Sequence, residues 1–227
     1  MKKSMALGLA LLAEGGLVAF TYAQEHKDSH AEQDPHAEHD HSAHAEQEAE
    51  GEAAMWEAFA KASTPGTNHH HLSPLVGKWD AVGKFRFTPE APWQQSRSKA
   101  EFTWIMGGRF LTQKVFGEPM MAQMPSFEGF GIIGYDNNAK KYNSFWVDNY
   151  GTMMMMGEGT CDAAGTTFTF KSTFTDPMSG QPTWMRSVYK IEGNDRFVLS
   201  MYGPDPTGKE FLTMEITNTR SGTTKPG

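Results

Sequence analysis

From Val76 to the end of the chain, the sequence shows no helical periodicity. Short runs rich in Phe, Trp, Thr, Val and Met alternate there with Gly, Asn, Asp and Pro. Such alternation of strand-forming runs and turn residues is typical of an all-β domain. Successive side chains of a strand point to opposite faces, and the first run keeps its aromatic residues on one face. We expect that face to point into the core; its members are Trp79, Ala81, Gly83, Phe85 and Phe87.

Ten such runs follow one another, and tight turns such as Asp136-Asn137-Asn138 and Gly193-Asn194-Asp195 connect many of them. Consecutive strands joined in this way favour an antiparallel up-and-down meander, which removes its edges by closing into a barrel. We predict strands near residues 76–87, 97–106, 109–117, 127–135, 141–148, 152–160, 166–175, 183–192, 196–203 and 209–220.

The charge of the chain is concentrated before this domain. Eleven acidic residues and only two lysines lie between Gln24 and His71, and they account for the formal net charge of −7, because residues 72–227 are nearly neutral. A near-neutral body without a basic stripe offers no electrostatic footprint for nucleic acid. We therefore predict one β-barrel domain over residues 72–220, a flexible C-terminus over 221–227, and no nucleic-acid partner.

Residues 1–23 resemble a secretory signal. Lys2 and Lys3 precede an apolar stretch, and Thr21-Tyr22-Ala23 offers small residues for cleavage before Gln24. We expect export to the periplasm or the extracellular space. Glu14 interrupts the apolar stretch, so we predict no stable membrane span unless the signal stays uncleaved.

Residues 24–51 form a low-complexity acidic segment that holds most of the histidines and few apolar residues, so we expect it to be disordered when free. Imidazole and carboxylate groups together suit zinc, nickel or copper(II). We predict exchangeable sites for such a divalent metal; alternatively, the segment is a solubilising spacer. The candidate metal ligands are His26, His30, His36, His39, His41 and His44.

Residues 52–71 are predicted to form a short helix and a connection to the barrel. The helix covers residues 52–62, where Met55, Trp56 and Phe59 give it one apolar face. Ser63-Thr64-Pro65-Gly66 ends it. Because an apolar face requires burial, we expect the helix to pack across the open end of the barrel.

The chain from about Met55 to Arg220 resembles the bacterial "domain of unknown function 1579" family. The matching motifs are Pro-Gly-x-x-His from Pro65, Leu-x-x-Leu-Val-Gly-x-Trp from Leu72, Gly-Gly-Arg-Phe-Leu from Gly107, Phe-Glu-Gly-Phe-Gly-Ile-Ile-Gly-Tyr-Asp from Phe127, Trp-x-Asp from Trp146, and the closing Ile-Thr-Asn-Thr-Arg from Ile216. The resemblance implies a calycin-type barrel similar to lipocalins and brings no established activity. It places His69 on the histidine of the first motif, and it implies that Arg220 covers the Trp79 indole by a cation–π contact.

A cavity inside the barrel is the candidate functional site. Ligand sites are mostly apolar with a few fixed polar groups, whereas a small barrel can also fill its interior with its own side chains. The predicted ligand-binding residues are Trp104, Arg109, Tyr135, Trp146, Asp148, Glu158, Trp184 and Arg186.

The sequence leaves three functions open. The preferred one is an exported barrel that binds a small apolar ligand and carries a metal-binding segment. The second is a zinc, copper or nickel buffer or delivery protein whose barrel is a scaffold. The third is an enzyme that uses the barrel cavity, although a body without histidine shows no nucleophile–base pair.

Two methionine groups could favour copper(I): Met120, Met121 and Met124, and the run from Met153 to Met156. Adaptable packing explains these methionines better.

Overall fold

The computed structural model of the protein describes residues 41–222, with side chains from residue 46 onward. The predicted signal (1–23), the first part of the histidine-rich segment (24–40) and most of the predicted C-terminal tail (223–227) lie outside the described residues. Residues from Ala49 onward belong to one compact unit. Among the described residues, no helix is long and apolar enough to cross a membrane.

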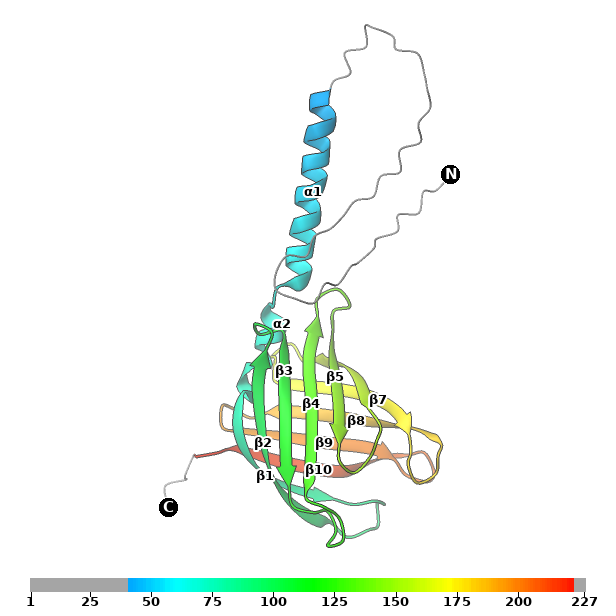
Figure 1. Cartoon of the computed structure of the whole chain (residues 1–227). Helices are drawn as coiled ribbons and strands as arrows, with labels where there is room; N and C mark the ends of the chain where they lie inside the picture. Colours follow the sequence, from blue (N-terminus) through cyan, green and yellow to red (C-terminus); the bar gives the residue numbers. More distant parts are fainter. Residues whose placement is uncertain (1–40, 223–227) are drawn as a thin grey trace. The chain divides into compact units, whose positions relative to one another are not determined.

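The predicted ten-stranded antiparallel barrel is confirmed. Each strand pairs with its neighbours in the chain, and the last strand pairs with the first, so the sheet closes without free edges (Figure 1). The strands are β1 (Gly77–Phe85), β2 (Gln94–Ile105), β3 (Phe110–Gly117), β4 (Phe127–Asp136), β5 (Lys141–Asp148), β6 (Met155–Cys161), β7 (Thr167–Thr175), β8 (Pro182–Ile191), β9 (Arg196–Pro204) and β10 (Glu210–Arg220).

The inward face of β1 follows the alternation read from the sequence. Trp79, Ala81, Gly83 and Phe85 are buried, while the residues between them are exposed or half-buried. Phe87 is the exception, because the strand ends at Phe85 and Phe87 is exposed in the loop that follows. The prolines of this loop remove backbone donors that a longer strand would need.

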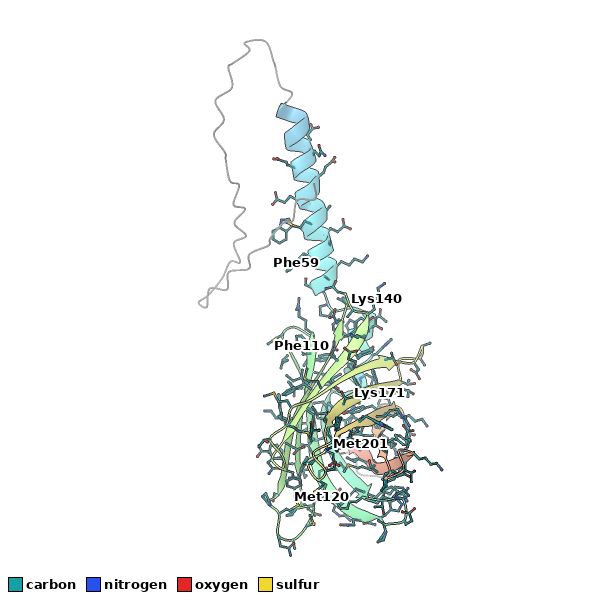
Figure 2. The ribbon with its side chains drawn as sticks, turned by 90° about the vertical axis from the view of Figure 1, so that its right-hand side faces the viewer. Phe59, Phe110, Met120, Lys140, Lys171 and Met201 are labelled. Atoms are coloured by element: carbon teal, nitrogen blue, oxygen red, sulfur yellow. The ribbon has the colours of Figure 1, made fainter. Side chains whose placement is uncertain are left out.

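Three helical elements precede the barrel, and the two short ones, which follow the first, close one of its ends. They are α1 (His41–Ser63), α2 (Thr67–His70) and the 3₁₀ helix η1 (Ser73–Leu75). Leu72 and Leu75 are fully buried against Trp79 and the rest of the core. We call this the closed end. The open end is the opposite one, formed by the loops 86–93, 118–126, 149–154, 176–181 and 205–209. Figure 2 shows Phe110 and Lys140 near the closed end and Met120 near the open end, with Met201 between them.

Arg220 joins the last strand to the closed end. Its guanidinium lies 4.3 Å from the centroid of the Trp79 ring and donates hydrogen bonds to the carbonyls of Val76 (2.8 Å) and Pro74 (3.1 Å). The Trp79 Nε1 donates to the Leu75 carbonyl at 2.8 Å. The cation–π contact expected between these two residues is therefore present, and it fixes the closed end rather than forming a reactive site.

Helix α1 differs from the expectation in extent and in packing. It begins at His41 rather than at residue 52, because residues 45–54 are mostly Ala, Glu and Gln, which favour helix. Its three large apolar side chains, Met55, Trp56 and Phe59, are exposed. Its last turn contacts the β4–β5 turn at the closed end, not the open end: the Asn137 Nδ2 donates to the carbonyls of Ala62 (3.0 Å) and Thr64 (2.8 Å). An amide that bonds carbonyls left unpaired by the helix end anchors the helix without burying a face.

His69 is a buried residue of α2. Its Nδ1 accepts a hydrogen bond from the Gly66 amide at 3.1 Å, and its ring meets Tyr135 edge to face at 5.8 Å. Burial lowers the pKa of His69 below its usual value of 6.5, and a hydrogen bond with the Tyr135 backbone offsets this only partly. The neutral ring is therefore the form that fits the fold, since a protonated Nδ1 can no longer accept the Gly66 amide.

We expect acidification to destabilise the protein through His69. Between its lowered folded pKa and about 6.5, the unfolded chain binds more protons than the folded one, so the free energy of unfolding falls as pH drops through this window. Urea denaturation at pH 7.5 and 5.5 measures the fall. The His69→Asn variant keeps an acceptor for Gly66 and should show a smaller pH dependence; an equal dependence would assign the effect to other groups.

Candidate functional site

The barrel encloses a cavity of about 300 Å³ between its middle and its open end. Most of its wall is apolar. Met120 enters from the β3–β4 loop, and the other methionines come from strands β6, β8, β9 and β10. The principal apolar lining residues are Met120, Met155, Met185, Met201, Met214, Val115, Ile133, Leu199, Ile216, Phe127, Phe170 and Trp146.

Hydroxyl and amide groups form the polar part of the wall. Five serines from four strands line the cavity: Ser96, Ser98, Ser144, Ser172 and Ser187. Deeper in the barrel, the Tyr189 hydroxyl donates to the Gln113 Oε1 at 3.5 Å, a long hydrogen bond from β8 to β3. Burial raises the pKa of Tyr189 to about 12. This phenol therefore stays protonated at neutral pH, and the polar groups at the cavity floor are uncharged.

Trp146 forms one wall of the cavity because glycines lie beneath it. A Cβ at Gly131 would lie 2.9 Å from the Trp146 ring, and one at Gly129 would overlap it. Phe127 stacks on the same indole with centroids 6.4 Å apart. The Trp146 Nε1 donates to the Asp148 Oδ2 at 2.9 Å, which fixes the ring in place.

Charged side chains reach the cavity only at its open end. Asp148 ends β5, and its second oxygen, Oδ1, accepts the Tyr150 amide at 3.0 Å. Arg97 and Glu118 also border the opening, and both side chains are exposed. The interior wall therefore offers apolar surface, hydroxyls and one amide, with charged groups of both signs only at the mouth.

The structure brings two of the eight predicted ligand-binding residues to this cavity, Trp146 and Asp148. Three others lie near the closed end: Trp104 and Tyr135 pack against the core, and Arg109 donates to the Met106 carbonyl at 3.0 Å in the β2–β3 turn. The remaining three are on strands β6 and β8 and do not line the cavity; they are Glu158, Trp184 and Arg186.

Strand alternation explains the positions of Trp184 and Arg186 on β8. Met185 and Ser187 line the cavity, so Trp184 and Arg186, which alternate with them along the strand, point outward. Arg186 instead pairs with Glu210 through its Nε at 2.9 Å and lies 4.0 Å from the Tyr202 ring centroid. The same alternation could have identified the serines that the prediction missed: once Trp146 is placed inward, Ser144 and Asp148 must share its face.

A second group of titratable residues belongs to the closed end. The Tyr142 hydroxyl donates to the Asn68 carbonyl at 2.8 Å and lies 3.4 Å from the His71 Nδ1. Burial raises the pKa of Tyr142, and burial with the neighbouring Asp162 carboxylate raises that of Cys161 to about 11. A thiol with a raised pKa is a poor nucleophile. The Tyr142 hydroxyl therefore holds α2 against β5.

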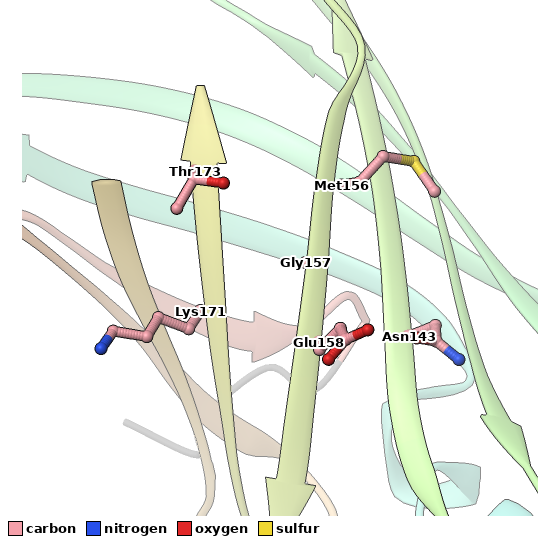
Figure 3. A pocket seen from close by; sticks show the side chains of 6 residues that line it. All are labelled: Asn143, Met156, Gly157, Glu158, Lys171 and Thr173. Atoms are coloured by element: carbon pink, nitrogen blue, oxygen red, sulfur yellow. The ribbon is translucent and has the colours of Figure 1, made fainter. Parts of the chain in front are cut away.

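The outer surface carries a separate hollow of about 470 Å³ between strands β5, β6 and β7. Figure 3 shows its side chains, including Glu158 and Lys171. Glu158 accepts from the Lys141 Nζ at 2.6 Å. Because its charged side chains are exposed on one side of the sheet, the hollow is more open to solvent than the cavity inside the barrel.

The predicted metal ligands belong to the part of the chain before the described side chains. His26, His30, His36 and His39 lie outside the described residues, and for His41 and His44 only the helical backbone of α1 is described. Within the described part of the chain, no group of three or more His, Cys, Asp or Glu side chains is placed to hold a metal ion.

Comparison with known proteins agrees with the barrel. Residues 64–220 match the model of a family described as "Protein of unknown function (DUF1579)". A search of curated proteins found no match. Among solved structures, that of Rv2717c from M. tuberculosis is similar, with a TM-score of 0.53 and 15% sequence identity over 70% of this chain and 99% of that chain. At this identity the likeness shows a shared fold.

Proposed function

We propose that this chain, which belongs to the DUF1579 family of proteins of unknown function, binds a small, largely apolar molecule inside its barrel. The observation that carries the proposal is the cavity of about 300 Å³ with a mostly apolar wall and a few placed polar groups. Such a composition is the usual one for small-molecule sites. The methionines suit this role because their flexible thioethers adapt to irregular ligand shapes.

Binding is favoured over catalysis by the chemistry of the lining. The lining residues include no histidine, cysteine or lysine. Both oxygens of Asp148 already accept hydrogen bonds, and none of the five cavity serines hydrogen-bonds to a described side chain that could act as a base. A catalytic role would need a nucleophile within hydrogen-bond reach of a base.

Titration with N-phenyl-1-naphthylamine, an uncharged apolar fluorophore, tests this proposal. We expect its emission to rise on binding to the full chain with one site per protein, because it moves from water into an apolar cavity. The matched pair Ser187→Trp, which fills the cavity, and Ser200→Trp, on the outer face of β9, locates the site. Equal binding by both variants, or none by the natural protein, would contradict the proposal.

We further propose that the N-terminal part of the chain binds divalent metal after export. Its support is the sequence: six histidines are interspersed with carboxylates between residues 26 and 46. We expect zinc uptake, measured by titration calorimetry, to be lost when these six histidines are replaced by asparagine in the full chain, while fluorophore binding persists. An N-terminus at Gln24 in protein isolated from outside the cytoplasm would support export.

The rival proposal is that metal handling is the main role and the barrel is a scaffold. The two proposals differ in one result. If the natural protein binds zinc but no fluorophore or other organic molecule, the scaffold proposal holds and ligand binding by the barrel is excluded.

A further inference from the structure

The serine hydroxyls of the cavity are available to a ligand. Of the five, only Ser144 forms a hydrogen bond with another described residue, a long one of 3.4 Å to the Gly157 carbonyl. Among the described residues, no buried side-chain nitrogen or oxygen atom lacks a hydrogen-bond partner. The remaining hydroxyls therefore face the cavity space rather than being enclosed in packed protein, and each can donate or accept one further hydrogen bond.

Two of these hydroxyls are paired over a glycine. A Cβ at Gly157 on β6 would lie 2.5 Å from the Ser172 Oγ and 2.6 Å from the Ser144 Oγ. Ser144 and Ser172 flank Gly157 in register on the neighbouring strands β5 and β7. The missing side chain leaves room for both hydroxyls at one point of the wall, where a single polar group of a ligand can contact the two.

No lysine or arginine of the described strands points its side chain into the interior wall of the cavity. On the strands that line the cavity, the lysines and arginines occupy outward positions, and the one inward-facing arginine, Arg220, covers Trp79 at the closed end. Arg97 lies between the inward-facing Ser96 and Ser98 and is exposed at the opening. A carboxylate or phosphate inside the barrel would have no opposite charge to replace the water it loses, which is strongly unfavourable.

Resting on the proposed ligand binding, we infer that the ligand is an uncharged molecule whose alcohol, carbonyl or amide group is held by the Ser144–Ser172 pair, and that anionic amphiphiles are rejected. The apolar body of the ligand then contacts the methionines toward the open end. The Gln113 amide and the Tyr189 hydroxyl, both uncharged, continue the same neutral polar surface at the cavity floor.

Competition between matched ligands tests the inference. The full chain is loaded with N-phenyl-1-naphthylamine and titrated with 1-decanol or with decanoate, which have the same chain length and differ in head-group charge at pH 8. We expect decanol to displace the fluorophore at a concentration at least about tenfold lower, the ratio for a difference of about 1.4 kcal/mol. Equal or stronger displacement by decanoate overturns the inference and leaves ligand binding intact. If neither the fluorophore nor decanol binds, the proposed function itself fails.

A pair of serine variants tests the contact. Replacing Ser144 and Ser172 together by alanine should weaken decanol binding by about threefold to tenfold, the range for one neutral hydrogen bond. Fluorophore affinity should change less than about twofold. Ser200→Ala, on the outer face of β9, is the control and should change neither. Unchanged decanol affinity in the double variant would remove the Ser144–Ser172 pair from the inference.

Discussion

Trp79→Ala should lower the free energy of unfolding by about 3–5 kcal/mol, the range for removing a large aromatic side chain from a core. The side chain is 1% exposed. Its ring meets Phe197 edge to face at 4.8 Å, and the Arg220 guanidinium lies over the ring at 4.3 Å from its centroid. Removing the indole leaves a cavity where β1, β10 and η1 meet. Urea denaturation monitored by circular dichroism measures the loss.

The control for this prediction is Trp93→Ala. Trp93 is 37% exposed in the β1–β2 loop, where Arg86 and Lys84 lie over its ring at 4.4 and 5.1 Å. We expect a loss of about 1 kcal/mol or less. If Trp79→Ala does not fold, Trp79→Phe serves instead, because it removes the hydrogen bond to Leu75 and should cost about 1–3 kcal/mol. Equal losses at positions 79 and 93 would contradict the closed end described above.

Gly129→Ala should reduce both stability and ligand binding. The new methyl group would overlap the six-membered ring of Trp146, which must then leave its place beside Phe127. We expect a loss of about 1–3 kcal/mol, typical of overpacking a core. Because Trp146 is a wall of the cavity, its displacement should weaken fluorophore binding at least about tenfold, equivalent to 1.4 kcal/mol. Denaturation and fluorescence titration measure the two effects.

Gly203→Ala is the matched control. Gly203 is also a buried strand glycine, but a Cβ there would meet its nearest neighbour, the Thr213 Cγ2, at 3.5 Å, which is ordinary contact. We expect its stability to remain within about 0.5 kcal/mol of the natural protein and its binding to be unchanged. If the two alanine variants behave alike, the position of Trp146 is not set by the glycines beneath it.

The strands were predictable because turn residues and alternation are local signals. The inward face of β1, from Trp79 to Phe85, needed only a period of two. The cavity required more, since its residues are selected by their depth along the barrel as well as by their face. Trp104 and Tyr135 pack against the core as expected of inward residues, yet they lie too near the closed end to reach a ligand. How deep a residue lies along the barrel axis depends on the stagger between neighbouring strands, and the sequence of a single strand does not specify that stagger.

Which side chains of a strand point into the barrel could not be predicted where both faces of the strand carry apolar and polar residues. On β8, Trp184 and Arg186 alternate with Met185 and Ser187. An aromatic and a cation look more like a binding site than a methionine and a serine do, although the latter pair lines the cavity. The deciding fact is Tyr189, which shares the face of Ser187 and is buried. Helix α1 illustrates the opposite limit: its apolar residues indicated burial, and the structure leaves them exposed.

The pairing of β1 with β10 has a consequence for how fast the barrel forms. The hydrogen bond between Arg220 and the Val76 carbonyl joins residues 144 positions apart, and every contact across this seam is similarly distant in sequence. Contacts of such long range form slowly, because the intervening chain must first lose its freedom. Until the final strand arrives, β1 keeps an open edge on which another chain could pair. A ribosome-bound or truncated chain that ends before Glu210 is thus expected to be the aggregation-prone form of this protein.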